Sequence, residues 1–343
     1  MTINSVSSAY LQHMTDDEIR EEIAKRGSEF VKRAFPGTPV QATTLEGALQ
    51  EAGANFTVEK HPLLVVNHVD GLKNSDAAIS ECASHVATVR TDTMTQLGVV
   101  GKDYGVVQTA TGMEALDILA KRGDVDIVSV ENVNGGARVR VTALIGVTTF
   151  LSANGAPNTL GNFAVFEASH DGTACFTASV YTLRLECFNG MTSRQVVKVH
   201  KLRHTSKVSD RVEATTLSIL SVLIGDVAAE NEIFKRLTTR PMSTREFGEF
   251  TTELLGGEIA EDASDAKKTR RENTVKELTE YFLGGNQGAG PTAWGAYNSV
   301  TRWVEAKREG IEDAKKAAAK FTSNLEGDGQ KKVARALKLL TRW

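Results

Sequence analysis

The fold is decided by residues 162–189, which read NFAVFEASHDGTACFTASVYTLRLECFN. Two runs rich in β-branched and aromatic residues flank Asp171-Gly172, a dipeptide that favours the tight turn of a β-hairpin. From Ala174 to Phe188 the side chains alternate between two faces, as they do in a strand that is buried on one side. This stretch therefore predicts an antiparallel hairpin at the centre of the chain.

The segments before the hairpin read mostly as strands, and those after it read as helices. Strand patterns occur at residues 56–66, 97–101, 104–108, 125–133 and 138–151. Helix patterns occur at residues 111–122, 210–240, 244–256, 264–283, 291–309 and 330–340. Two capping boxes, Thr15-Asp-Asp-Glu18 and Thr43-Thr-Leu-Glu46, open two further helices, the first of which is expected to end before Pro36. A third, Ser243-Thr-Arg-Glu246, opens the helix at residues 244–256.

Strands followed by helices predict the α+β class. We expect an antiparallel sheet with hairpins in the centre of the chain, capped by N-terminal helices and by a helical C-terminal third. In domain terms, residues 1–210 form a mixed α+β domain, and residues 211–343 form a helical region that packs on or extends from the sheet.

The composition excludes several classes of protein. The chain has 343 residues, of which 41% are apolar and 24% charged, as in soluble globular proteins. No apolar run approaches the roughly 20 residues of a membrane span, and no signal peptide begins the sequence. The cysteines, Cys82, Cys175 and Cys187, form no C-x-x-C pair. We therefore expect reduced thiols and a cytoplasmic protein.

The chain is markedly basic after the hairpin. Between residues 184 and 211, seven lysines and arginines stand against two acids, although the net charge of the chain is −3. Clustered cations neutralise phosphates and release counterions, so this run predicts a nucleic-acid-binding surface; the competing interpretation is a solvated face. The candidate contact residues are Arg184, Arg194, Lys198, Lys201, Arg203, His204, Lys207 and Arg211.

Other side chains in this region admit two interpretations each. The aromatic residues Phe176, Tyr181 and Phe188 either stack on unpaired bases or belong to the core. His200 and His204 are four residues apart and would share a helix face, where they could bind a metal; the neighbouring cations Lys201 and Arg203 disfavour this. Further along, Trp294 and Tyr297 lie on an apolar helical stripe that is typical of core packing.

Several stretches resemble an uncharacterised family of phage- and plasmid-like proteins, a numbered domain of unknown function. They are TLEGALQEAG (44–53), LGVVGKDY (97–104), SHDGT (169–173), RLECFN (184–189), VHKLRHT (199–205) and TAWGAYNSVT (292–301). The resemblance implies a phage or mobile-element setting in a bacterial host. It implies no mechanism.

No enzyme motif is present in the sequence. It contains no phosphate-binding G-x-x-x-x-G-K-[ST], no G-x-S-x-G and no H-E-x-x-H, and we expect neither a cofactor nor a metal. A sheet with a basic hairpin and adjoining helices resembles the plan of Rad52-like annealing proteins, an analogy of fold alone. We therefore expect a non-enzymatic protein that binds or anneals single-stranded DNA in replication or recombination, and a homo-oligomer is left open. The alternatives are a metal-dependent nucleic-acid enzyme and a protein–protein factor that acts on host machinery.

Overall fold

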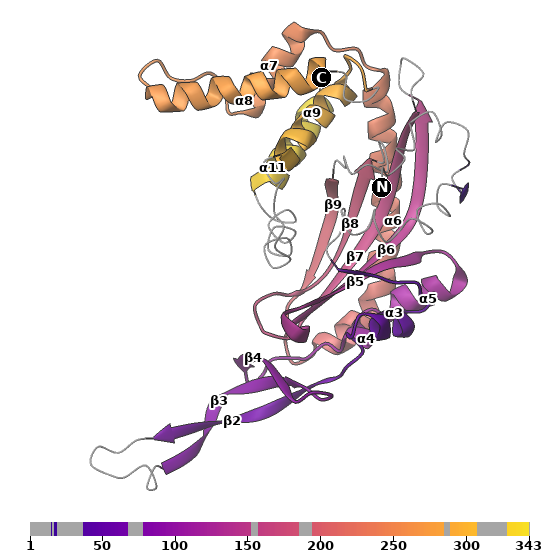
Figure 1. The fold of residues 1–343 in the computed structure, drawn as a ribbon, viewed down its shortest axis with the longest axis vertical. Helices are drawn as coiled ribbons and strands as arrows, with labels where there is room; N and C mark the ends of the chain where they lie inside the picture. The colour runs from indigo at the N-terminus through magenta and orange to yellow at the C-terminus, as the bar shows by residue number, and fades with distance from the viewer. Residues whose placement is uncertain are drawn as a thin grey trace, which may run out of the picture.

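A six-stranded antiparallel sheet forms the centre of the protein, in the order β1-β5-β6-β7-β8-β9 (Figure 1). The computed structural model describes residues 15, 17–18, 37–67, 78–151, 157–184, 194–284, 289–306 and 328–342. The strands are β1 (Thr38–Pro39), β5 (Asp126–Val133), β6 (Arg138–Leu151), β7 (Pro157–Ser169), β8 (Phe176–Arg184) and β9 (Arg194–Leu202). Helices lie before, beside and after this sheet, so the predicted α+β class is confirmed.

The central hairpin is formed by β7 and β8, with Phe166 opposite Ala178. Its turn is closed by the carboxylate of Asp171, which accepts hydrogen bonds from the backbone N–H of Thr173 at 3.0 Å and from the Ser169 hydroxyl at 2.8 Å. Gly172 has a φ of +76°, a left-handed conformation that glycine adopts without steric cost. The turn therefore lies where the Asp-Gly dipeptide predicts it.

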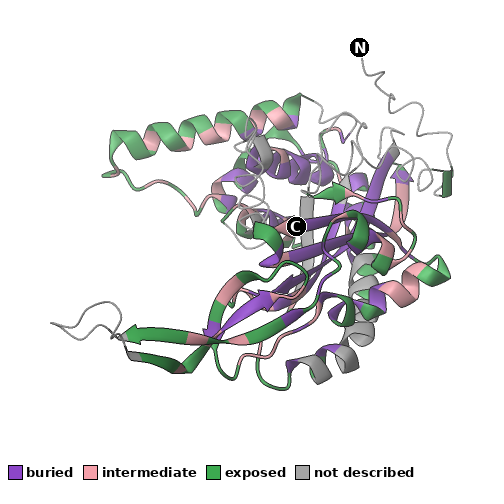
Figure 2. Ribbon diagram, turned by 60° about the horizontal axis from the view of Figure 1, so that its bottom comes forward, coloured by how far each residue is buried: buried purple, intermediate pink, exposed green. Residues whose placement is uncertain are grey.

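A second, three-stranded sheet projects from the main sheet as an arm (Figure 1). It consists of β2 (Val58–Asn67), β3 (Ala78–Arg90) and β4 (Thr95–Gly101). Figure 2 shows that much of this arm is exposed, whereas the described residues of β5, β6, β7 and β8 are largely buried.

The predicted strand at residues 104–108 is wrong, because these residues pair with no strand and instead connect β4 to the helices that follow. Their alternation arises from packing. Val107 is buried in a core, and the Gln108 side chain hydrogen-bonds both the N–H and the C=O of Val58 at 3.0 and 2.8 Å. This glutamine thus occupies a position at the edge of β2 that a neighbouring strand would otherwise take.

One face of the main sheet carries the first hydrophobic core. Val139, Val141 and Phe166 contribute to it from the sheet, and the helices α3 (Leu45–Glu51), α5 (Glu114–Arg122) and the start of α6 (Val208–Thr239) cover it. The predicted helix at 111–122 is divided at Met113 into α4 (Thr109–Gly112) and α5. Helix α3 is capped by Thr44, one residue later than predicted, through a bond from the backbone N–H of Gly47.

A second hydrophobic core joins the helical part of the chain to the far end of the sheet. It contains the end of α6 together with α7 (Thr244–Leu254), α8 (Asp265–Leu283), α9 (Ala293–Ala306) and α11 (Asp328–Leu340), packed against Phe150 and Leu160. Trp294 and Tyr297 are buried here, which confirms their core role, and the indole N–H of Trp294 donates to Asn158 Oδ1 at 2.8 Å. Because α6 contributes to both cores, it connects the sheet to the C-terminal helices.

The predicted starts of three helices agree with the structure to different degrees. The Ser243–Glu246 capping box opens α7 as predicted. The reciprocal bonds between Thr15 and Glu18 are also present, but the helix expected after them lies outside the described residues. Helix α6 begins at Val208, two residues before the predicted start. The physical reason is that Val208 is buried in the first core, and this packing stabilises a helix that begins at Val208 instead of at residue 210.

Candidate nucleic-acid interface

The turn between β9 and α6 is built on a short segment of the preceding chain, Tyr104-Gly105. The ring of His204 stacks on the ring of Tyr104, with centroids 4.6 Å apart and planes inclined by 12°. His204 Nδ1 lies 2.9 Å from the carbonyl oxygen of Gly105, whose own N–H points back to the His204 carbonyl oxygen at 3.4 Å. A Cβ atom at residue 105 would lie 2.1 Å from the Thr205 carbonyl oxygen, so this close approach requires glycine. The turn is therefore held in a defined position.

Four exposed cations surround this anchored turn: Lys201, Arg203, Lys207 and Arg211. Lys201 lies near the end of β9, which is the last strand in the order of the sheet, and Arg211 lies in the first turn of α6. Within the described part of the chain, no carboxylate lies within ion-pair distance of Arg203 or Lys207. We call these four residues the turn cluster. Because their charges are concentrated within eleven residues of chain, they can contact adjacent phosphates of one polyanion.

Three of the predicted contact residues cannot be placed. Arg184 lies in β8, and Arg194 and Lys198 lie in β9, but their side chains are outside the described part of the structure. The backbones of Arg184 and Arg194 lie at the end of the β8–β9 pair opposite the turn cluster, and that of Lys198 lies in the middle of β9. The structure therefore places the side chains of the turn cluster alone among these seven cations.

His204 is half-buried against Tyr104 and Gly105. Burial lowers the pKa of His204, while its hydrogen bond to the Gly105 carbonyl and the charge of Asp171 act in the opposite direction. The imidazole is therefore neutral at pH 7, and it positions the turn instead of supplying positive charge to a phosphate.

The aromatic residues of the hairpin belong to the core. Phe176 and Tyr181 are 1% and 2% exposed, so they cannot stack on bases, and Phe188 lies outside the described residues. The two histidines do not share a helix face either, because His200 is in β9 and His204 is in the turn. Across the described ranges no three histidine, cysteine or acidic side chains are grouped as metal ligands.

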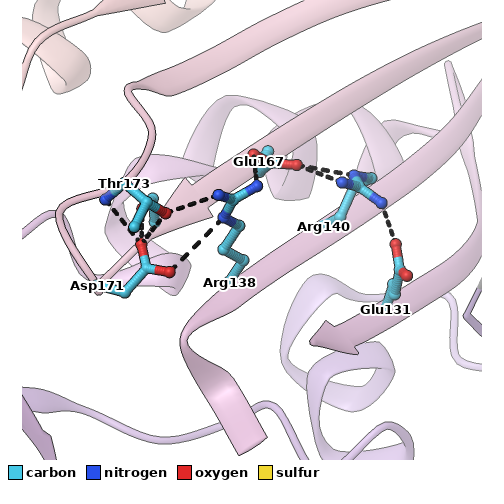
Figure 3. A network of polar contacts seen from close by, with 7 residues as sticks. Glu131, Arg138, Arg140, Glu167, Asp171 and Thr173 are labelled. Atoms are coloured by element: carbon cyan, nitrogen blue, oxygen red, sulfur yellow. Dashed lines mark hydrogen bonds and ion pairs between the residues drawn. The ribbon is translucent and has the colours of Figure 1, made fainter. Parts of the chain in front are cut away.

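A buried charge network lies on the opposite face of the sheet from the first core (Figure 3). Arg140 is 2% exposed, and its guanidinium bonds the carboxylates of Glu131 and Glu167, the latter at 2.5 and 2.9 Å. The three residues stand directly opposite one another on β5, β6 and β7. The ion pairs therefore hold these strands in one register, since a slip by one residue would move the charges into the first core.

The same network continues to the turn of the hairpin. Arg138 donates to the Thr173 hydroxyl at 2.6 Å and lies 3.8 Å from Asp171 and 4.0 Å from Glu167 (Figure 3). The sequence contained a signal for this network, because Arg138, Arg140 and Glu167 interrupt otherwise apolar strands with charges at alternating positions.

Next to this turn, His170 is fully buried. Its Nε2 lies 3.2 Å from the Thr109 hydroxyl, and its carbonyl accepts a hydrogen bond from the Thr88 hydroxyl at 2.6 Å. Burial, and to a smaller extent the charge of the nearby His204, lowers the pKa of His170 to about 4. A neutral histidine thus joins the base of the β2-β3-β4 arm to the central hairpin.

Fold and site together define an α+β protein in which a basic turn, anchored by a stacked histidine, lies at one edge of an antiparallel sheet. The chain belongs to the family described as a domain of unknown function (DUF932), whose family model matches residues 96–338. No curated protein and no solved structure matches the chain. Among the helices that the structure describes, none has the length and apolar character needed to cross a membrane.

Proposed function

We propose that this protein binds single-stranded DNA without chemical turnover, through the turn cluster. The binding would serve annealing or protection of single strands in replication or recombination, in the cytoplasm of a bacterium that carries a phage or mobile element; this setting rests on the sequence resemblance. The observation that carries the proposal is the concentration of four exposed cations on a turn whose backbone is anchored by Tyr104, Gly105 and His204.

Two physical features support a phosphate-directed mode of binding. The first is that the anchored turn fixes the backbone from which Arg203 and Lys207 extend, which lowers the entropic cost of binding. The second is that the turn leads directly into α6, a helix of 32 residues whose N-terminal end carries a partial positive charge. Because Phe176 and Tyr181 are buried, we expect contacts to the backbone and little sequence preference.

The test is fluorescence anisotropy with a labelled oligonucleotide at several salt concentrations. The variant Lys201→Ala/Arg203→Ala removes two cations of the turn cluster. If each contacts one phosphate, the slope of log K against log [salt] should fall by about 1.4, and affinity at 0.1 M salt should fall about 25-fold. The matched control is Lys121→Ala/Arg122→Ala, which removes two exposed cations from the end of α5 and should bind normally.

A structural role for the turn cluster gives a different result. Cations on a terminal strand also prevent edge-to-edge association of sheets. If the turn variant binds DNA like the wild type and instead forms larger assemblies in size-exclusion chromatography, the cations protect the edge and the proposal is refuted.

A catalytic role is tested with the same substrates. Labelled single- and double-stranded DNA incubated with the protein and Mg²⁺ should remain intact. Cleavage that a chelator abolishes would replace the binding function with that of a metal-dependent nuclease.

A further inference from the structure

The last described helix, α11, carries a second group of cations. Lys331, Arg335 and Lys338 follow one another at spacings of four and three residues, which places them on one side of the helix, and Arg342 follows two residues after the helix ends. All four are exposed, whereas Val333, Ala336, Leu339 and Leu340 on the other side are buried in the second core. We call these four cations the α11 stripe. The buried side fixes the helix, so the stripe has a defined direction.

An open groove adjoins the first part of this stripe. It has a volume of about 720 Å³ and lies between α8, the end of α7 and the start of α11. Five cations and two acids line it, which gives a formal charge of +3. The cations are Arg270, Arg271, Lys331, Lys332 and Arg335, and the acids are Glu277 and Asp328.

Both acids of the groove have partners. Asp328 pairs with Lys331 at 3.1 Å, and Glu277 accepts a hydrogen bond from the indole N–H of Trp303 at 2.9 Å. The groove therefore keeps an excess of positive charge.

Several of the cations are held in place by neutral groups. Arg271 donates to the carbonyl oxygens of Leu255, Thr252 and Gly257 at 2.7, 3.0 and 2.8 Å, and Arg335 donates to that of Glu253 at 2.8 Å. Carbonyl groups carry no net charge, so these interactions fix the guanidinium groups without neutralising them.

Lys332 is fixed in a similar way. Its ammonium lies 4.8 Å from the centroid of the Trp303 ring, which is also uncharged overall. Side chains that are already ordered lose little further entropy when an anion binds.

The extent of the positive charge indicates the kind of ligand. Lys338 lies seven residues after Lys331 in the helix, a distance of about 10 Å, which is longer than a single phosphate group, and Arg342 extends the row beyond the end of the helix. The indole of Trp303 is buried, so it offers no surface for a base. Such an arrangement fits several consecutive phosphates of an extended backbone.

We propose that the α11 stripe and the adjoining groove form a second contact surface for the phosphate backbone of single-stranded nucleic acid. This inference rests on the proposed function. Helix α11 also packs beside β9, the strand that leads into the turn cluster (Figure 1). A strand of nine residues is about 30 Å long, so one nucleic-acid strand that runs along β9 can reach both surfaces.

The competing explanation is structural, because Arg271 and Arg335 cap the carbonyl end of α7. The test therefore uses cations outside that role. Lys338→Ala/Arg342→Ala changes the far half of the stripe, and Arg270→Ala changes the groove. None of these three side chains has a hydrogen bond or ion pair with another described residue. Lys121→Ala/Arg122→Ala is again the matched control.

The binding assay uses a labelled 30-nucleotide strand at 0.1 M salt, with circular dichroism to verify that each variant is folded. We expect the stripe variant to bind about 25-fold more weakly with a salt slope lower by about 1.4, and Arg270→Ala to bind about fivefold more weakly. A three-nucleotide strand, which is too short to span both surfaces, should show a smaller loss in each variant.

The outcomes separate the two proposals. If the stripe variant binds like the control while Lys201→Ala/Arg203→Ala is weakened, the second surface is refuted and the turn cluster stands. If the stripe variant alone is weakened, the second surface stands and the proposed site at the turn fails. Absence of binding by the wild type at 0.05 M salt refutes both. Preferential binding of a poly-glutamate peptide to the stripe would overturn the nucleic-acid assignment in favour of an acidic protein partner.

Discussion

Replacing Arg140 by methionine should destabilise the sheet strongly. Methionine fills a similar volume but leaves the carboxylates of Glu131 and Glu167, which are 7% and 5% exposed, without their shared cation. Removing one partner of a buried ion pair typically costs 3–5 kcal/mol, since the remaining charge loses its compensation without regaining water. We expect a loss of about 4 kcal/mol in the free energy of unfolding, measured by urea denaturation with far-ultraviolet circular dichroism at pH 7.5.

The same variant should recover stability as the pH falls. Burial raises the pKa of Glu131, and the charge and hydrogen bond of Arg140 oppose this rise. Without Arg140 the pKa of Glu131 rises further, so the folded protein takes up a proton more readily than the unfolded chain. A group with a raised folded-state pKa favours folding increasingly as the pH falls towards its unfolded value of about 4.3. The difference from wild type should therefore be smaller at pH 5.5 than at pH 7.5.

Two further variants test the reasoning. Arg138→Met changes an arginine whose side chain is 23% exposed, and it should cost only about 1 kcal/mol. Glu131→Gln/Arg140→Met/Glu167→Gln removes all three charges and should recover much of the lost stability, because no buried charge remains. A loss below about 1 kcal/mol for Arg140→Met at both pH values would show that these charges are hydrated, and the argument from burial would fail.

Three other predictions concern separate features of the fold. The pKa of His170 is lowered to about 4, so its contribution of about 3 kcal/mol to the free energy of unfolding should be fully present above pH 6.5 and be lost as the pH falls towards 4. His170→Gln should therefore flatten the profile of stability against pH between pH 6.5 and 4, and an unchanged profile would contradict this assignment to His170. Gly105→Ala would press a methyl group against the Thr205 carbonyl oxygen and should lower the free energy of unfolding by about 1–3 kcal/mol. The variant should also bind DNA more weakly although no charge is removed, whereas normal binding would show that the contact between Gly105 and the turn is dispensable. Asn158→Ala should lower the free energy of unfolding by about 1–3 kcal/mol in the wild type but by much less in a Trp294→Phe background, because this double-mutant cycle isolates the hydrogen bond between Asn158 and Trp294. Equal losses in both backgrounds would exclude a role for this hydrogen bond in stability.

Local sequence patterns determined much of the secondary structure. The Asp171-Gly172 turn, the strand at 138–151 and the Ser243 capping box all lie where they were expected, because each depends on residues close together in the chain. The class of fold follows from their order. Errors occurred where a distant contact changed a local preference, as at residues 104–108, whose alternating pattern reflects contacts with β2 and with the turn before α6.

The candidate site was predictable only in outline. Composition alone located a basic run between residues 184 and 211, and periodicity predicted the helix at residues 330–340. Neither could assign His204 to the stacking partner Tyr104, which lies 100 residues earlier in the chain.

By itself, the sequence determined which segments form strands and helices and where positive charge is concentrated, because these properties depend on neighbouring residues. Tertiary structure alone decided which charges are buried and which remain exposed. Arg140 and Lys201 have similar charges in similar strands, yet Arg140 lies at the centre of the sheet between two glutamates, and Lys201 lies on its last strand. The free energy of a charge depends on its distance from water and from opposite charges, and both distances are set by the order in which the strands assemble.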